Sequence, residues 1–231
     1  MNVMKPVVLF DFSGTIIDDF EVCYNANVVG LHTVTKKPLS RKLFAELALP
    51  ITNFLNYFGI KNENDKRTLL GIYQKYYQEN LDRVSLFPDV KPALKKLKDK
   101  GIKVGIVSQQ LRSVILFELK RFGISEFFTD DSIIGFEDSH EQKPSKIPIV
   151  TAMKKMGADE ADTIFVGDMI QDIQAAKNSN VKSVAIAREN GNYKSEVHGS
   201  YHTKEMLIAE NPDYVFSGLE EFVSNLGNKT S

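Results

Sequence analysis

The residues of this sequence best suited to chemistry stand at or near the ends of short apolar segments. Three are acids, one carries a hydroxyl and one an amine: Asp11, Asp168, Asp172, Ser108 and Lys143. Carboxylates that gather without compensation repel one another, so a cluster of acids calls for a cation. Oxygen ligands with no histidine or cysteine at metal-ligand spacing suit a hard ion, above all Mg²⁺. A metal ion, a lysine and a hydroxyl around an open position suit a phosphoryl group.

The loop after the first apolar segment adds a second means of holding an anion. The stretch VVLFDFSGTI covers residues 7–16, and Gly14 stands three positions after Asp11. Glycine has no Cβ, so the backbone there can come close to a ligand. Successive N–H groups can then hold phosphate oxygens.

Taken singly, these residues also have simpler interpretations. Asp11 could be a turn residue, Asp168 and Ser108 could be helix caps, and Lys143 could be a solvated loop lysine. What separates the two interpretations is whether the residues converge, and that depends on the elements before them.

Six apolar runs rich in valine and isoleucine are too short for helices and predict buried strands: Val7–Phe10, Ile102–Val107, Ile133–Gly135, Thr163–Val166, Ser183–Ala187 and Tyr214–Phe216. Segments with helical periodicity alternate with them: Val90–Lys100, Arg112–Phe122, Ser145–Met156 and Ile170–Asn178. This alternation predicts an α/β fold, a Rossmann-like parallel sheet covered by helices on both faces. Ligands of such sheets bind outside the carboxyl ends of the strands, where the polar residues stand.

One region interrupts the alternation directly after the first strand. It has helical patterns and no convincing strand, and Ser40 is predicted as the N-cap of the segment RKLFAEL. Three tyrosines there are expected to pack in the core and interface: Tyr73, Tyr76 and Tyr77. We therefore predict an α/β core of residues 1–16 and 87–231, and an inserted α-helical cap of residues 17–86.

Composition excludes several classes of protein and partner. The chain has 231 residues and a formal net charge of −1, so no strong field attracts nucleic acid or an anionic membrane. Its only cysteine, Cys23, leaves no internal disulfide and no cysteine metal cluster. No apolar run is long enough to span a bilayer, and Met1–Lys5 lacks a signal-peptide pattern. A cytoplasmic protein is expected, and the oligomeric state stays open.

Two further expectations concern the C-terminal part and the histidines. The polar segment Glu189–Lys204 contains Gly191 and Gly199 and predicts a long loop near the active edge. The four histidines have no metal-ligand spacing and are expected at surface or loop positions: His32, His140, His198 and His202.

The motifs DFSGT, VSQQ, KP and GDMIQD occur in the order and context typical of the haloacid dehalogenase-like superfamily. The stretches LFPDVKPALKKLKDKGIKVGIVSQQ and GDMIQDIQAAKNSNVKSVAIA are similar to its phosphoglycolate phosphatase and phosphoglucomutase branch. The resemblance covers nearly the whole chain, and the helical insertion stands where that branch carries its cap. Each motif alone is a weak signal, but four in order form a strong one.

This resemblance implies a Mg²⁺-dependent phosphatase and a role for each residue. Asp11 would attack phosphorus and form an aspartyl-phosphate. Asp168 would bind Mg²⁺ together with Asp11 and the backbone carbonyl of Ser13, and Asp172 would order the metal's surroundings. The remaining residues would hold the phosphoryl group, neutralise its charge or shape the loop: Ser108, Gln109, Lys143, Gly14 and Thr15.

Ser13 departs from the family pattern. Most phosphatases of this family have aspartate there, which protonates the leaving oxygen and then activates water. A serine hydroxyl does neither well, and lost general acid–base help typically costs about 10²–10⁴-fold in rate. The nucleophile and the carbonyl ligand survive, so the sequence predicts slow turnover unless help comes from elsewhere.

Help could come from the substrate or from another residue. An acyl phosphate or an anhydride has a good leaving group and needs little acid. Other groups near the predicted site could supply the proton: Glu137, Asp138, His140, Asp18 and Asp19. The simpler interpretation is that the stretch GFEDSHEQKP and the pair Asp18 and Asp19 are solvated loops.

The favoured function is hydrolysis of a small phosphorylated metabolite, a phosphoglycolate-like or sugar phosphate. The alternatives are a catalytically impaired phosphate-binding or regulatory protein, and a phosphotransferase. Multiple turnovers with Mg²⁺ on a generic aryl phosphate would separate the first from the second.

Overall fold

The computed structural model describes residues 6–47, 51–188 and 201–226. A six-stranded parallel sheet forms its centre, with strand order β5-β4-β1-β6-β7-β8. The strands are β1 Val7–Phe10, β4 Lys103–Val107, β5 Ile133–Ile134, β6 Thr163–Gly167, β7 Lys182–Ile186 and β8 Tyr214–Phe216. Because β1 lies between β4 and β6, the residue after β1 stands between the residues that follow its two neighbours. The predicted Rossmann-like α/β fold is confirmed.

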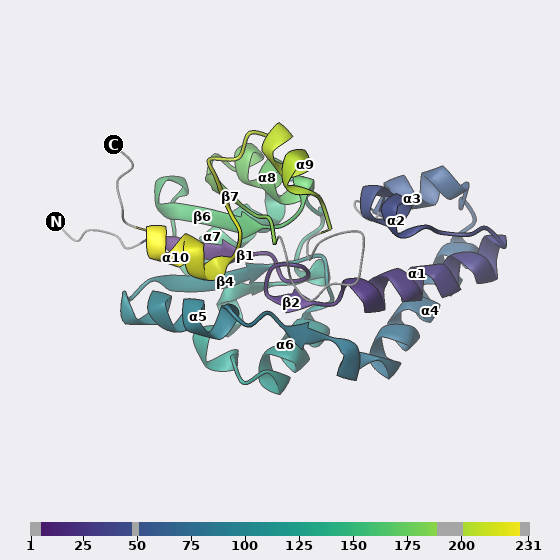
Figure 1. Ribbon diagram of the computed structural model, residues 1–231, viewed down its shortest axis with the longest axis horizontal. Helices are drawn as coiled ribbons and strands as arrows, with labels where there is room; N and C mark the ends of the chain where they lie inside the picture. Colours follow the sequence, from purple (N-terminus) through teal and green to yellow (C-terminus); the bar gives the residue numbers. More distant parts are fainter. Residues whose placement is uncertain (1–5, 48–50, 189–200, 227–231) are drawn as a thin grey trace.

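Helices cover both faces of this sheet (Figure 1). One face packs on α5 (Val90–Asp99), α6 (Arg112–Arg121) and α10 (Leu219–Asn225). The other packs on α7 (Ile147–Met156) and α8 (Ile170–Asn178). In β1, Val8 and Phe10 belong to the first core and Val7 and Leu9 to the second. Successive strand residues point to opposite faces, so a strand buried on both is apolar throughout.

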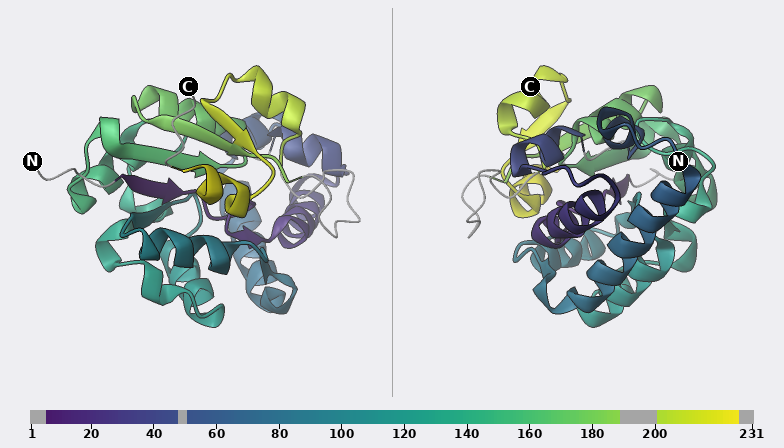
Figure 2. Two further views of the ribbon diagram at one scale, coloured as in Figure 1. Left: turned by 60° about the vertical axis from the view of Figure 1, so that its left-hand side comes forward. Right: turned by 90° about the vertical axis from the view of Figure 1, so that its right-hand side faces the viewer.

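The helical insertion forms a lobe beyond one end of the sheet (Figures 1 and 2). Its helices are α1 Phe20–Thr35, α2 Arg41–Leu47, α3 Ile51–Phe58 and α4 Glu63–Glu79. The Ser40 hydroxyl accepts the N–H of Leu43 at 3.2 Å, which confirms the predicted cap of α2. The division of the chain into two domains stays a prediction.

The expectation of no strand within the insertion was wrong at its two ends. β2 (Ile17–Asp18) and β3 (Ser85–Leu86) pair antiparallel where the chain leaves and re-enters the core. Two residues are too few for an alternating pattern to be visible in sequence.

The remaining elements are short. They are α9 Lys204–Ala209 and five 3₁₀ turns, η1 Leu81–Arg83, η2 Ser125–Phe127, η3 Asp130–Ser132, η4 Phe136–Asp138 and η5 Glu160–Asp162. Within the described ranges, no helix combines the length and apolarity needed to cross a membrane.

Candidate active site

Lys143 joins two of the predicted acids at the carboxyl edge of the sheet. Its Nζ lies 2.5 Å from Asp11 Oδ1 and 2.6 Å from Asp172 Oδ1, and all three side chains are buried. Asp11 directly follows β1, and its N–H donates to the Val166 carbonyl of β6. Asp172 lies in the first turn of α8, where Oδ2 accepts the N–H of Met169 at 2.9 Å. Asp11 and Asp172 thus share one ammonium, although they lie 132 and 29 positions from Lys143 in the chain.

Asp168 completes the acid cluster from the end of β6. The hydroxyl of Thr15 donates to its Oδ1 at 2.9 Å, and it is fully buried. The loop after β1 leaves room for this carboxylate because Gly14 has φ +84°, and a Cβ there would lie 2.2 Å from Asp168 Oδ2. Gly14 and Thr15 therefore position an acid in this structure, and their contacts with a phosphate stay a prediction.

The same packing rule applies to Asp172. A Cβ on Gly167 would lie 2.2 Å from Asp172 Oδ2. Glycine at the last residue of β6 is therefore needed for the carboxylate to reach Lys143.

Burial dominates the electrostatics of this cluster. It raises the pKa of Asp11 to about 7, although the Lys143 ammonium acts against the rise. Burial, followed by the charges of Asp11 and Asp172, raises the pKa of Asp168 well above its usual range. Burial alone would lower the pKa of Lys143, but the two carboxylates outweigh it and raise that pKa. One ammonium thus faces three buried acids, an arrangement with a deficit of positive charge.

The acid cluster fits a divalent hard cation. Ligand atoms of Asp11, Asp168 and Asp172 all lie within 4.8 Å of one another. The donors are carboxylate oxygens, the type that Mg²⁺ prefers, and each oxygen has a second lone pair beside its present hydrogen bond. A metal ion bound there would favour the charged forms of Asp11 and Asp168, against the effect of burial.

The predicted phosphate ligands Ser108 and Gln109 directly follow β4, and Gln109 bonds to the backbone of the loop that carries Lys143. Ser108 is buried, donates its N–H to the Ile134 carbonyl at 2.9 Å, and accepts the N–H of Gln110 on its Oγ at 3.1 Å. Gln109 donates its side-chain amide to the Lys143 carbonyl at 3.3 Å, so it ties this loop to the loop that carries the lysine. Contact of Ser108 and Gln109 with substrate stays a prediction.

Ser13 points at a carboxylate six residues further along the chain. Its Oγ donates to Asp19 Oδ2 at 2.8 Å, and Asp19 is 1% exposed at the start of α1. Three more groups bond to the same carboxylate: the Cys23 thiol at 3.5 Å, the Tyr77 hydroxyl at 3.2 Å and the Tyr201 hydroxyl at 3.4 Å. Burial raises the pKa of Asp19 to about 6, and the bonds from Ser13 and Cys23 act against the rise.

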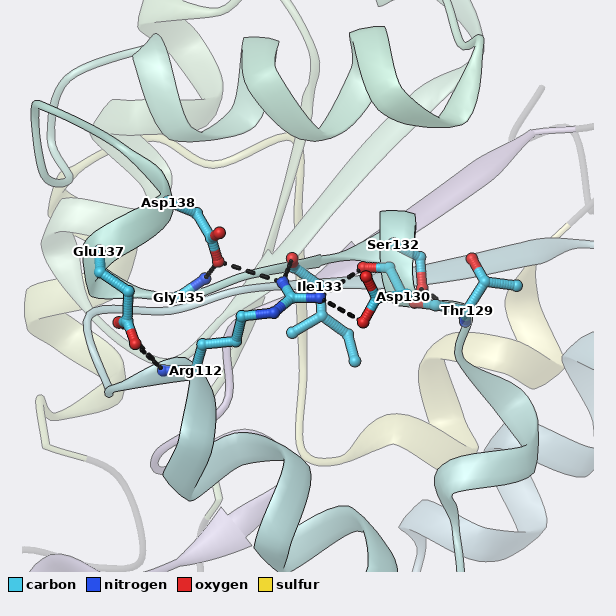
Figure 3. Close-up of polar contacts among 8 residues, drawn as sticks. All are labelled: Arg112, Thr129, Asp130, Ser132, Ile133, Gly135, Glu137 and Asp138. Atoms are coloured by element: carbon cyan, nitrogen blue, oxygen red, sulfur yellow. Dashed lines mark hydrogen bonds and ion pairs between the residues drawn. The ribbon is translucent and has the colours of Figure 1, made fainter.

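Three of the other predicted proton donors, Glu137, Asp138 and His140, lie in the loop after β5. Figure 3 shows Arg112 between the loop residues on both sides of β5. Its backbone N–H donates to Glu137 at 3.1 Å, and its guanidinium pairs with Asp138 at 3.1 Å. The side chain of His140 is 77% exposed and lies 3.9 Å from Glu141. Glu137 and Asp138 therefore hold the loop after β5 in place, and of the five candidates Asp19 is the one bonded to Ser13.

Two residues at the edge of the site were not named as site residues by the sequence analysis. The N–H of Tyr201 donates to Asp168 Oδ2 at 3.3 Å, and its ring packs on Phe20 of α1 and Phe44 of α2. His202 lies in a loop, as expected, but is buried there, and its Nδ1 accepts the N–H of Ile170 at the start of α8. Burial lowers the pKa of His202 to about 4, so the ring is neutral at physiological pH.

These two residues belong to the segment predicted as a loop near the active edge. Residues 189–200 of that segment, with His198, lie outside the described part, while Lys204 begins α9 rather than ending a loop. A hydrogen bond between residues 33 apart, as between Asp168 and Tyr201, leaves no local pattern in the sequence.

Comparison with known proteins agrees with the fold and the family resemblance. The family model described as haloacid dehalogenase-like hydrolase matches residues 8–186. A protein of Caldanaerobacter subterraneus with the provisional name pyrophosphatase PpaX is 32% identical over 216 residues, 90% of this chain and 88% of that protein. The phosphoglycolate phosphatase of Neisseria meningitidis is 26% identical over 227 residues, 95% of this chain and 92% of that protein.

Solved structures share the fold over almost the whole chain. A hydrolase from Pseudomonas syringae aligns with a TM-score of 0.80 at 17% identity, covering 98% of this chain and 100% of that one. The resemblance drawn from the motifs is confirmed, and the chain belongs to the haloacid dehalogenase-like hydrolases as an enzyme of their phosphatase type.

Proposed function

We propose that this protein is a Mg²⁺-dependent phosphatase that acts on a small phosphorylated metabolite through an aspartyl-phosphate on Asp11. The observation that carries the proposal is the position of Lys143, bonded to both Asp11 and Asp172, with Asp168 beside them. A buried nucleophile between an ammonium and a metal-type acid cluster suits attack on a phosphate ester, whose own charge must be neutralised.

Asp11, Asp168 and the backbone carbonyl of Ser13 would hold Mg²⁺, with Asp172 beside them, and the ion would neutralise charge on the phosphoryl oxygens. Lys143 fixes one oxygen of Asp11 and provides positive charge where the phosphoryl group arrives. In the first step a carboxylate oxygen of Asp11 attacks phosphorus, and the bond from phosphorus to the leaving oxygen breaks with its electron pair. With serine at position 13 no acid protonates the leaving oxygen, so an alkyl leaving group departs as an alkoxide and takes its proton from water.

The second step needs a base, and the bond between Ser13 and Asp19 provides a route. Water attacks phosphorus and the bond to Asp11 breaks, which restores the carboxylate. The proton of the water moves to Ser13 Oγ as the proton of Ser13 moves to Asp19, 2.8 Å away. This route restores part of the general-base help that serine alone lacks.

Expulsion of the leaving group without an acid makes the rate depend on the leaving group. The relatives named above include a phosphoglycolate phosphatase and proteins named as pyrophosphatases. A phosphoanhydride has a much better leaving group than an alkyl phosphate, so we expect high sensitivity to leaving-group pKa in this protein. The cytoplasmic location and the absence of nucleic-acid and membrane partners stay predictions.

The test is turnover of p-nitrophenyl phosphate by the full chain with Mg²⁺. We expect many phosphates released per protein, activity abolished by EDTA, and at least about a hundredfold loss in Asp11→Asn. The matched control is Asp99→Asn, an exposed acid at the end of α5, which should keep full activity. Bound phosphate without turnover would favour the binding or regulatory alternative, and phosphate moved to an added alcohol would favour a phosphotransferase.

A further inference from the structure

The carboxylate of Asp19 is surrounded by neutral donors. Ser13, Cys23, Tyr77 and Tyr201 all bond to it, and the Cys23 thiol also meets the Tyr73 hydroxyl at 3.2 Å. We call these six residues the Asp19 cluster. Across the described ranges, no lysine or arginine pairs with Asp19.

Cations of the helical lobe do not reach this cluster either. In the described part of the lobe no lysine or arginine is buried. The two that are half-buried, Arg41 and Lys66, pair with Glu21 and Glu63. In the core, Lys143 is shared by Asp11 and Asp172, and Arg188 pairs with Asp89 at 2.9 Å.

Under the proposed mechanism, the Asp19 cluster would adjoin the leaving group of the substrate. Lys143 and the strand ends close the core side of Asp11. A phosphate ester on Asp11 therefore projects its leaving group toward the helical lobe. Ser13 lies two residues after Asp11, and its hydroxyl donates to Asp19 on that side.

An anionic leaving group would bring a second negative charge against a buried carboxylate that has no cation. Like charges placed together in this way strongly disfavour a partner. A hydroxyl-bearing leaving group can instead donate to Asp19 or exchange hydrogen bonds with the tyrosine hydroxyls.

We propose that Asp19 determines specificity, selecting phosphate esters whose leaving group is uncharged and bears a hydroxyl, and disfavouring those whose leaving group carries a carboxylate or phosphate. This inference rests on the proposed phosphatase function and narrows its substrate class toward polyol and sugar phosphates. The names of two relatives, a pyrophosphatase and a phosphoglycolate phosphatase, imply leaving groups that are anions, phosphate and glycolate. This chain is proposed to prefer uncharged ones.

The experiment compares two esters of the same length, 2-hydroxyethyl phosphate and phosphoglycolate, which differ by a hydroxymethyl group in place of a carboxylate. In the wild type with Mg²⁺ we expect kcat/KM for the neutral ester to exceed that for phosphoglycolate at least about tenfold. In Asp19→Asn the ratio should fall to within about threefold, because the loss of base help affects both esters alike while the discrimination against the carboxylate is removed. Glu21→Gln removes one acid from the same helix outside the cluster and should keep the wild-type ratio.

A binding measurement keeps the test independent of turnover. The dissociation constants of both esters are measured by calorimetry with Mg²⁺ on Asp11→Asn, alone and combined with Asp19→Asn. The same tenfold preference and its loss are expected. Absence of turnover in the wild type with the binding preference intact would refute the phosphatase proposal alone. A wild-type preference for phosphoglycolate, or a ratio that Asp19→Asn leaves unchanged, would overturn the specificity proposal.

Discussion

The hydroxyl of Ser13 donates to the carboxylate of Asp19 at 2.8 Å, beside the predicted nucleophile Asp11. The resemblance implies an acid where this chain has Ser13, and a carboxylate stands within one hydrogen bond of that position, supplied by the first residues of the helical insertion. Most of the consequences that can be measured follow from this pair.

The first prediction is an exchange of the two residues. Ser13→Asp alone places a second carboxylate against the buried Asp19, and like charges there oppose each other. Ser13→Asp combined with Asp19→Ser keeps one carboxylate and one hydroxyl, and should raise turnover of alkyl phosphates by up to about a hundredfold, since a direct acid is restored. Rates on alkyl and aryl phosphates are compared across wild type, single and double variants. A double variant that is folded and no faster than Ser13→Asp would show that Asp19 does not oppose the introduced acid.

The second prediction concerns pH and stability. The pKa of Asp19 is raised from 3.8 to about 6 in the folded protein, so the folded state holds this proton more tightly than the unfolded state. Stability from this group is therefore present below pH 4 and lost as the pH rises through 6. One pKa unit corresponds to about 1.4 kcal/mol, so ionised Asp19 destabilises the fold by up to about 3 kcal/mol at pH 8.

Asp19→Asn removes this penalty. Relative to the wild type, its free energy of unfolding should rise between pH 4 and pH 7, measured by urea titration in EDTA. Glu21→Gln serves as the control and should show no such rise. A difference between Asp19→Asn and wild type that is constant over this pH range would mean that Asp19 titrates normally.

The third prediction concerns Gly14. Gly14→Ala would place its Cβ 2.2 Å from Asp168 Oδ2 at φ +84°. We expect a loss of stability of about 2–4 kcal/mol, since both the left-handed backbone and the displaced acid are penalised. The control is Gly157→Ala at φ +63°, where nothing lies within 4 Å of the added Cβ. It should lose only about 1–2 kcal/mol. Equal losses in the two variants would refute the steric argument.

The fourth prediction concerns the metal. Mg²⁺ should raise the melting temperature of the wild type in a concentration-dependent way, because a ligand that binds only the folded state stabilises it. Asp168→Asn should abolish this rise while remaining folded in EDTA, since the amide still accepts the Thr15 hydroxyl bond. Calorimetry with Mg²⁺ gives the affinity directly. A Mg²⁺ response that survives in Asp168→Asn would remove Asp168 from the metal site.

Local sequence patterns predicted the sheet and the convergence of the acids well. The range of α8 was predicted to the residue, and the acids after β1 and β6 meet because parallel strands place their carboxyl ends at one edge. Lys143 was placed at the same edge from its position in the loop before the predicted helix at Ser145, and the resemblance gave its role.

What could not be predicted depends on packing between distant segments. The sequence offered five candidates for a replacement acid. Folding of the insertion brings Asp19 to Ser13, whereas Arg112 binds Glu137 and Asp138. Tyr201 reaches Asp168 across a long polar segment without any periodic signal. The hydrogen bond from the Thr15 hydroxyl to Asp168, 153 residues away, also had no local signal.

The most direct test of the account is the covalent intermediate. The wild type is incubated with acetyl phosphate and Mg²⁺, quenched in acid and digested, and the peptide that contains Asp11 is examined by mass spectrometry. The account predicts one added phosphoryl group on Asp11, no adduct in Asp11→Asn, and slower decay of the adduct in Ser13→Ala, where the route to Asp19 is cut. An adduct on another residue, or none at all while phosphate is being released, would contradict the aspartyl-phosphate mechanism.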